Sequence, residues 1–157
     1  MRKRITAQDE KVGSDGNVNW LNLEECAEVE VTSEDANYPI ELALIKEESR
    51  GWRASGPGKQ TIRLRFDHPQ DLHRIWLNFM ETNSGRTQEY VLCWSLDNGQ
   101  SFKEIVRQQW NFSPPSTISE IEDHHVELQG VNILDLSITP DISGGDSPAS
   151  LVRLRLA

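Results

Sequence analysis

The stretch RTQEYVLCWSLDNGQSFKEIVRQQW, residues 86–110, decides how the chain folds. Two apolar segments flank its central tripeptide, Asp97-Asn98-Gly99. Asn and Gly tolerate the positive φ of a tight hairpin turn, and Asp can bond to its own nearby backbone. A calcium loop of the EF-hand type would need further oxygen ligands and a glutamate at its twelfth position, which this stretch lacks. The tripeptide therefore predicts a β-hairpin turn, not a metal loop or a catalytic site.

Short segments with strand-like alternation run along the rest of the chain. In residues 60–66, apolar side chains at every second position alternate with Arg63 and Arg65, and the closing SLVRLRLA repeats the pattern. Residues 38–48, YPIELALIKEE, show helical spacing after Pro39. Roughly eight short strands with one short helix predict an all-β sandwich.

Length and charge limit the possible functions. The 157 residues fit a single domain, for which we expect a flexible polar leader at residues 1–18 and an ordered domain at 19–157. The net charge of -9 argues against binding to nucleic acid or to an anionic membrane. We expect a cytoplasmic protein with free, buried thiols at Cys26 and Cys93, because the basic start lacks an apolar signal segment.

The order of the segments carries a family resemblance. VTSEDANYPIELALIKEESRGWRA is followed by GKQTIRLRF, LHRIWLNF, YVLCWSLDNGQSFKEI and SLVRLRLA. Over residues 28–157 this series resembles the discoidin or coagulation-factor C-type domain. The resemblance implies a galactose-binding-domain-like jelly roll, a fold that carries many different ligands.

Many members of that family hold a structural calcium ion in a loop just before a Trp. Here the corresponding residues 46–52 read KEESRGW, with Lys46 and Arg50 in place of oxygen ligands. Two cations oppose the binding of a calcium ion, which takes six to eight oxygens. We therefore expect no metal and no cofactor.

Catalytic signatures are lacking in the sequence. There is no nucleophile elbow and no phosphate-binding glycine loop. The adjacent His124 and His125 would face opposite sides of a strand, so at most one could join a given site. The acidic residues 120–123 are interpreted as a solvated edge, and Cys93 as an inert strand residue. These observations predict that the chain is not an enzyme.

A candidate ligand site follows from the hairpin and from the resemblance. The family binds ligands through loops at one end of the sandwich, which here correspond to residues 35–38, 50–55, 83–88 and 109–116. A hairpin also brings its outer ends together. The predicted ligand-binding residues are Tyr38, Arg53, Arg86, Gln88, Gln109 and Trp110.

The tryptophans divide into two groups. Trp52 and Trp94 match positions at which the family buries an aromatic residue, whereas Trp76 could face outward. Trp110 is expected at the start of an irregular loop closed by two prolines. It could present a flat apolar face to a ligand or fill the space beneath the loop, and the sequence leaves both alternatives open.

The two RLR segments have two interpretations as well. Arg63, Arg65, Arg153 and Arg155 would line one outer face if their strands were neighbours, and could then bind an acidic partner. Alternatively they pair across strands with Glu28 and Glu30. The excess of acidic residues favours the pairing.

The sequence thus predicts a binding module of the jelly-roll type. Its ligand would be a carbohydrate or another small polar molecule bound by the end loops. The alternative is an adaptor that binds a protein partner through the same loops or through an Arg-bearing sheet face.

Overall fold

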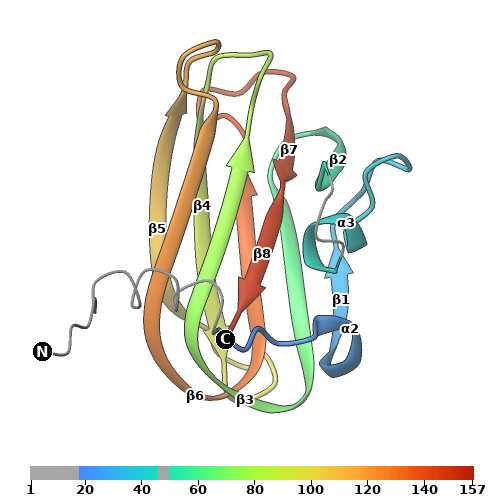
Figure 1. The fold of residues 1–157 in the computed structure, drawn as a ribbon, viewed down its shortest axis with the longest axis vertical. Helices are drawn as coiled ribbons and strands as arrows, with labels where there is room; N and C mark the ends of the chain where they lie inside the picture. The colour runs from blue at the N-terminus through green and yellow to red at the C-terminus, as the bar shows by residue number, and fades with distance from the viewer. Residues whose placement is uncertain (1–17, 46–49) are drawn as a thin grey trace, which may run out of the picture.

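The computed structural model describes residues 18–45 and 50–157, which form a two-layered β-sandwich (Figure 1). The elements along the chain are α2 (Leu23–Cys26), β1 (Ala27–Val31), α3 (Glu41–Leu44), β2 (Trp52–Pro57), β3 (Gln60–Met80), β4 (Arg86–Ser95), β5 (Lys103–Phe112), β6 (Ser119–Thr139), β7 (Pro148–Leu151) and β8 (Arg153–Leu156). The leader predicted for residues 1–18 lies outside the described residues except for its last position. No helix among the described residues is long and apolar enough to cross a membrane.

A folded ribbon of two long strands builds the sandwich. β3 and β6 have 21 residues each and pair antiparallel from Gln60↔Ile138 to Met80↔Ser119. The ribbon bends over at the lower end of Figure 1, so each strand contributes to both layers. One layer has the order β1-β3-β6-β4-β5, and β8 pairs with the second half of β3 in the other layer. β2 and β7 form a separate pair beside them.

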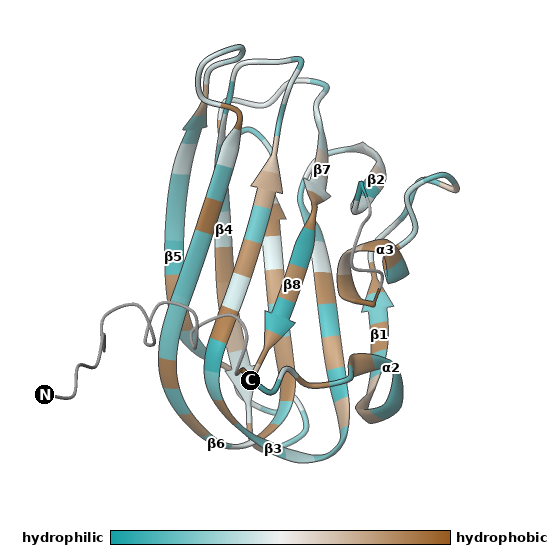
Figure 2. Ribbon diagram, in the orientation of Figure 1, coloured by the Kyte–Doolittle hydropathy of each residue, from teal (hydrophilic) through white to brown (hydrophobic). Residues whose placement is uncertain are grey.

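The bend explains why the sequence predicted separate short strands where the structure has two long ones. In the first half of β3 the buried apolar residues are Ile62 and Leu64, and in the second half they are Ile75 and Leu77. The alternation therefore changes phase, and the pairing with β6 shifts register between Arg65 and Arg74. A slip of one residue moves side chains to the other face, so the shift keeps both halves pointing inward. Figure 2 shows the alternating bands along these strands.

The core lies between the two layers. Leu72, Ile75, Leu77 and Phe79, the core residues predicted for β3, have no measurable exposure. The burial of Trp52 is confirmed, with 1% of its surface exposed. Trp94, for which the family resemblance implied burial, is instead half-buried, as are Trp76 and Trp110.

The hairpin prediction is confirmed. β4 and β5 pair antiparallel, and Asn98 and Gly99 have φ angles of 59° and 89°. The Asp97 carboxylate accepts hydrogen bonds from the hydroxyl groups of Ser101 and Ser95 and from the backbone N–H of Ser101. These bonds lower the pKa of Asp97 to about 2, so the turn is closed by an ionised carboxylate.

Other local predictions are met in part. The helix predicted within residues 38–48 appears as the four-residue helix α3. Residues 46–48 of that prediction lie outside the described residues. The sequence predicted neither the single turn α2 nor the strand β2. β2 is held mainly by its pairing with β7, a partner about a hundred residues away that no local pattern reveals.

Cross-strand pairing accounts for the Arg residues of the first RLR segment. Arg65 donates to Glu30 of β1, and Arg63 forms two hydrogen bonds of 2.8 Å with Asp135 of β6. Arg153 and Arg155 lie opposite the second half of β3, in the other layer. The four Arg therefore do not share one face, and the pairing interpretation is confirmed for Glu30.

A pair of glycine substitutions tests the close approach of β2 and β7. Gly51 and Gly58 both have positive φ, but a Cβ on Gly51 would lie 2.2 Å from the Leu151 carbonyl oxygen, whereas none of the surrounding atoms lies within 4 Å of one on Gly58. Gly58→Ala should cost about 1–2 kcal/mol of unfolding free energy from backbone strain. Gly51→Ala should cost at least about 2 kcal/mol more, measured by urea denaturation. Equal losses for the two variants would contradict the close approach of the Leu151 backbone to Gly51.

Candidate functional site

The outer ends of the hairpin meet as expected, but two of the predicted site residues are buried there. Gln88 lies opposite Trp110, and Arg86 lies opposite Phe112. The Arg86 side chain and the whole of Gln88 have no exposed surface. The prediction that Arg86 and Gln88 contact a ligand is corrected accordingly, because they point into the space between the layers.

Arg86 instead ties together the loops around it. Its Nε donates to Glu81 at 2.7 Å, and its Nη1 donates to the Pro140 carbonyl at 2.8 Å and to Gln88 at 3.2 Å. The guanidinium also lies over the Phe112 ring, 4.8 Å from its centre. Through these contacts, one buried cation holds the end of β6 against the loop between β3 and β4.

Glu81 shapes that loop. One carboxylate oxygen accepts the hydrogen bond from Arg86. The other accepts hydrogen bonds from the backbone N–H groups of Asn83 at 3.0 Å and Ser84 at 3.4 Å. Burial raises the pKa of Glu81, but the bonds from Arg86, Asn83 and Ser84 outweigh it and hold the pKa below its usual value. Glu81 is thus an ionised and fully engaged residue at the foot of the loop.

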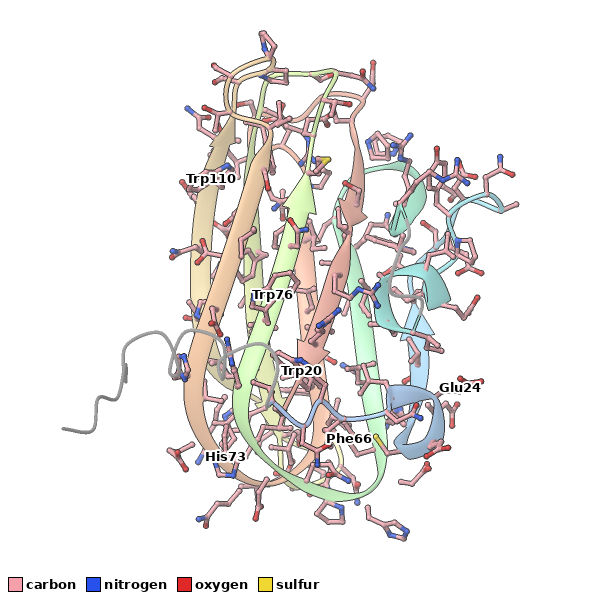
Figure 3. All side chains as sticks on the ribbon, in the orientation of Figure 1. Trp20, Glu24, Phe66, His73, Trp76 and Trp110 are labelled. Atoms are coloured by element: carbon pink, nitrogen blue, oxygen red, sulfur yellow. The ribbon has the colours of Figure 1, made fainter. Side chains whose placement is uncertain are left out.

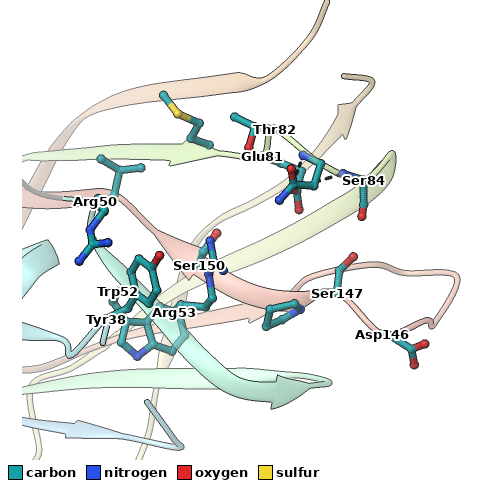
Figure 4. Close-up of a pocket in the computed structure, with 14 residues that line it drawn as sticks. Tyr38, Arg50, Trp52, Arg53, Glu81, Thr82, Ser84, Asp146, Ser147 and Ser150 are labelled. Carbon is teal, nitrogen blue, oxygen red and sulfur yellow. Dashed lines mark hydrogen bonds between the residues drawn. The ribbon is translucent and has the colours of Figure 1, made fainter. Parts of the chain in front are cut away.

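A pocket of about 690 Å³ opens beside this loop (Figure 4). Its volume falls within the usual range of small-ligand sites. It is lined by Tyr38, Arg50, Trp52, Arg53, Met80, Glu81, Thr82, Asn83, Ser84, Asp146, Ser147, Pro148, Ser150 and Val152. Of the six predicted site residues, the pocket contains Tyr38 and Arg53.

Tyr38 and two arginines form one end of the pocket. The guanidinium carbons of Arg50 and Arg53 lie 4.7 and 4.6 Å from the centre of the Tyr38 ring. The backbone N–H of Arg53 donates to the Tyr38 carbonyl, and the Arg53 carbonyl accepts from Asp35. The turn that carries Tyr38 is therefore fixed to β2. Trp52 forms the floor, with its indole N–H donating to the Ser33 carbonyl at 3.0 Å.

Gln109 and Trp110 lie away from this pocket. Both belong to β5, which continues to Phe112, so the prediction that Trp110 begins a loop is wrong. Figure 3 shows Trp110 on the side of the molecule opposite α3 and β2. Gln109 donates to Glu89 at 2.9 Å. The Trp110 side chain is half-buried with its Nε1 enclosed, an arrangement that matches the space-filling alternative.

The acidic residues 120–123 are not all solvated, as the sequence had suggested. Glu120 is 1% exposed and accepts a hydrogen bond from Gln88 at 3.3 Å. Burial, and then the neighbouring Glu122 carboxyl, raise the pKa of Glu120 to about 8. Nearby, His124 shares a hydrogen bond of 2.7 Å with the hydroxyl of Tyr90. The first half of β6 therefore places polar side chains in the interior, and burial favours the protonated form of Glu120.

Two kinds of chemistry, metal binding and thiol reactivity, depend on the His, Asp, Glu and Cys side chains of the described residues. The described residues contain no group of three His, Cys, Asp or Glu side chains that could hold a metal ion. Cys26 and Cys93 are free and half-buried, rather than fully buried as expected. Burial raises the pKa of both thiols, which disfavours the reactive thiolate.

Sequence reasoning missed one wall of the pocket. Asp146, Ser147 and Ser150 come from the loop before β7 and from β7 itself. The run GGDSP at residues 144–148 marks a loop in the sequence. Its place beside Tyr38 follows only from the pairing of Ser150 with Arg53.

Comparison with solved structures identifies the architecture. A family 32 carbohydrate-binding module from Clostridium perfringens NanJ, solved in complex with galactose, matches with a TM-score of 0.64 and 14% sequence identity, over 87% of this chain and 96% of that one. A pectin-binding carbohydrate-binding module matches with a TM-score of 0.59 and 15% identity, over 84% and 90% of the two chains. The chain has the jelly-roll fold of these modules.

The same jelly roll also occurs in a protein that binds another protein. Reduced XRCC1, solved bound to the DNA polymerase beta catalytic domain, matches with a TM-score of 0.60 and 14% identity, over 84% of this chain and 95% of that one. No protein-family model and no curated protein matches the sequence. Identities this low establish the fold of the jelly roll and leave its ligand to be argued from the pocket.

The raised pKa of Glu120 leads to a prediction about stability. A carboxyl whose pKa is higher in the folded state stabilises the fold fully below its unfolded value, near 4.5, and this stability is lost as the pH rises through about 8. Glu120→Gln keeps an acceptor for Gln88 without a titrating proton. The variant should therefore gain stability relative to the wild type between pH 5 and pH 8.5, by an amount on the order of 1–3 kcal/mol in unfolding free energy.

Thermal unfolding across this pH range provides the measurement. Glu28→Gln is the control, since Glu28 lies on the exposed face of a strand, β1, and its carboxylate is in water. A Tm difference between Glu120→Gln and the wild type that does not change with pH would contradict the assignment.

Proposed function

We propose that this chain is a non-catalytic carbohydrate-binding module whose ligand occupies the pocket beside Tyr38. The observation that carries the proposal is the content of that pocket. An aromatic ring with two guanidinium groups lies at one end, and hydroxyl, amide and carboxylate side chains from two loops line the rest. Sugars need such a combination of an apolar surface and planar hydrogen-bonding groups.

Two further points support a saccharide. Structural neighbours with the same fold were solved with galactose or are described as pectin-binding. The pocket is also concave, with polar residues that are exposed at its rim, such as Thr82, Asn83 and Ser84. A protein partner, as in the XRCC1 complex, is the alternative, but a pocket of this size suits a small polar ligand better.

The absence of catalysis belongs to the same proposal. Some matched modules are parts of enzymes, and one was solved together with an alginate lyase domain. In this chain the carboxylates of the pocket are Glu81, which is engaged by Arg86, and the exposed Asp146. The first is not available as a general acid, so the pocket does not offer the pair of carboxyl groups that glycoside hydrolysis uses.

Binding to a glycan array, followed by isothermal titration, tests the proposal. Tyr38→Ala removes the ring that both arginines contact and should weaken binding at least about tenfold, equivalent to about 1.4 kcal/mol. Phe102→Ala is the matched control, because Phe102 also carries an arginine, Arg63, over its ring but belongs to the hairpin turn at the other end of the sandwich (Figure 1).

A second variant covers the case in which Tyr38→Ala unfolds. Ser150→Trp would place a bulky side chain in the middle of the pocket and should abolish binding while the Tm stays near the wild-type value. An array without hits at millimolar protein concentration would overturn the proposal, as would unchanged binding to the Ser150→Trp variant.

A further inference from the structure

Arg50 and Arg53 differ from most of the other arginines in the described part of the chain in what they contact. Five others form ion pairs with carboxylates: Arg63, Arg65, Arg74, Arg86 and Arg107. Arg50 and Arg53 contact the Tyr38 ring and form no ion pair with any residue of the described ranges 18–45 and 50–157. In a protein with a net charge of -9, two cations without a described carboxylate partner at one end of a pocket are unusual.

Their placement suits an anionic group. Both arginines are exposed, so a ligand can reach them, while contact with the Tyr38 ring limits the orientations of the two planar guanidinium groups. Planar N–H donors match the geometry of a carboxylate or a sulfate, and groups that are already ordered lose less entropy on binding. The Tyr38 end of the pocket is therefore built to receive an oxyanion.

The acidic residues of the pocket do not cancel this charge. Glu81 is neutralised by the buried guanidinium of Arg86. Asp146 lies at the far end of the pocket from Arg50 in Figure 4. Ser150 lies between the two ends, so hydroxyl groups of a sugar ring would meet it and Asp146 while an acidic substituent meets the arginines.

We propose that the ligand of this pocket is an anionic saccharide whose oxyanion is bound by Arg50 and Arg53. The inference rests on the proposed carbohydrate-binding function and specifies its ligand class. A uronic acid and a sulfated sugar share the required chemistry, and the probes below distinguish them.

The experiment measures binding of four matched probes by isothermal titration: oligogalacturonate, its methyl ester, a sulfated galactan oligomer and a neutral galactan oligomer. Oligogalacturonate or the sulfated oligomer should bind at least about tenfold more tightly than the neutral probes. The affinity should fall as the NaCl concentration rises from about 50 to about 500 mM, because salt screens exposed charges. Whichever acidic probe binds identifies the source of the oxyanion.

Two substitutions locate the interaction. Arg50→Gln and Arg53→Gln keep hydrogen-bonding groups but remove the charge, and each should weaken binding of the acidic probe at least about fivefold while leaving weak binding of neutral galactan unchanged. Arg107→Gln is the control: it removes the same charge from an exposed position on β5, outside the pocket, and should have no effect.

The possible failures are distinguishable. Equal binding of acidic and neutral probes, or loss of binding to both in Arg53→Gln, would overturn the anionic ligand and leave the carbohydrate-binding function intact. If none of the four probes and no glycan on the array binds, the carbohydrate-binding function itself fails, and the inference fails with it.

Discussion

The buried guanidinium of Arg86 is the interaction on which the candidate site depends. A charged group without exposed surface depends on its hydrogen bonds, and here Nε donates to Glu81 while Nη1 donates to the Pro140 carbonyl and to Gln88. Nη2 is buried without a hydrogen-bond partner among the described residues. Glu81 in turn fixes the backbone of the loop that lines the pocket. The buried Arg86–Glu81 pair thus holds the loop after β3 in one conformation as a wall of the pocket. An exposed ion pair contributes too little stability to do this.

The folded β3–β6 ribbon determines where that wall can lie. Because both strands pass through both layers, the loop after β3 and the loop after β6 reach the same end of the sandwich. The first half of β6 carries Glu120 inward opposite Phe79, close to Gln88. The interior next to the site is therefore polar, and burial there favours the neutral form of Glu120. The opposite half of the ribbon contributes buried apolar residues such as Leu64 and Leu134 to the core.

Sequence patterns predicted the features that depend on near neighbours. The turn at Asn98 and the alternation around Ile75 are local, so they were predicted correctly. The end of β5 was predicted wrongly, because Trp110 remains in the strand through its pairing with β4. In the sequence EIED, residues 120–123, the pattern does not show whether the even-numbered or the odd-numbered residues face inward. Pairing with β3 places Glu120 in the interior. The wall formed by Ser150 follows likewise from a contact between distant strands.

The same residue type plays two roles at this end of the molecule, and burial separates them. Arg86 is enclosed and its bonds are used internally, so its contribution is structural. Arg53 is exposed and contacts a ring, which orients the guanidinium without satisfying its N–H donors. A sequence shows two arginines near predicted loops and gives no reason to distinguish them. In the folded chain, Arg50 and Arg53 expose guanidinium groups beside Tyr38 that form no ion pair with the described residues, and these donors are available to a ligand.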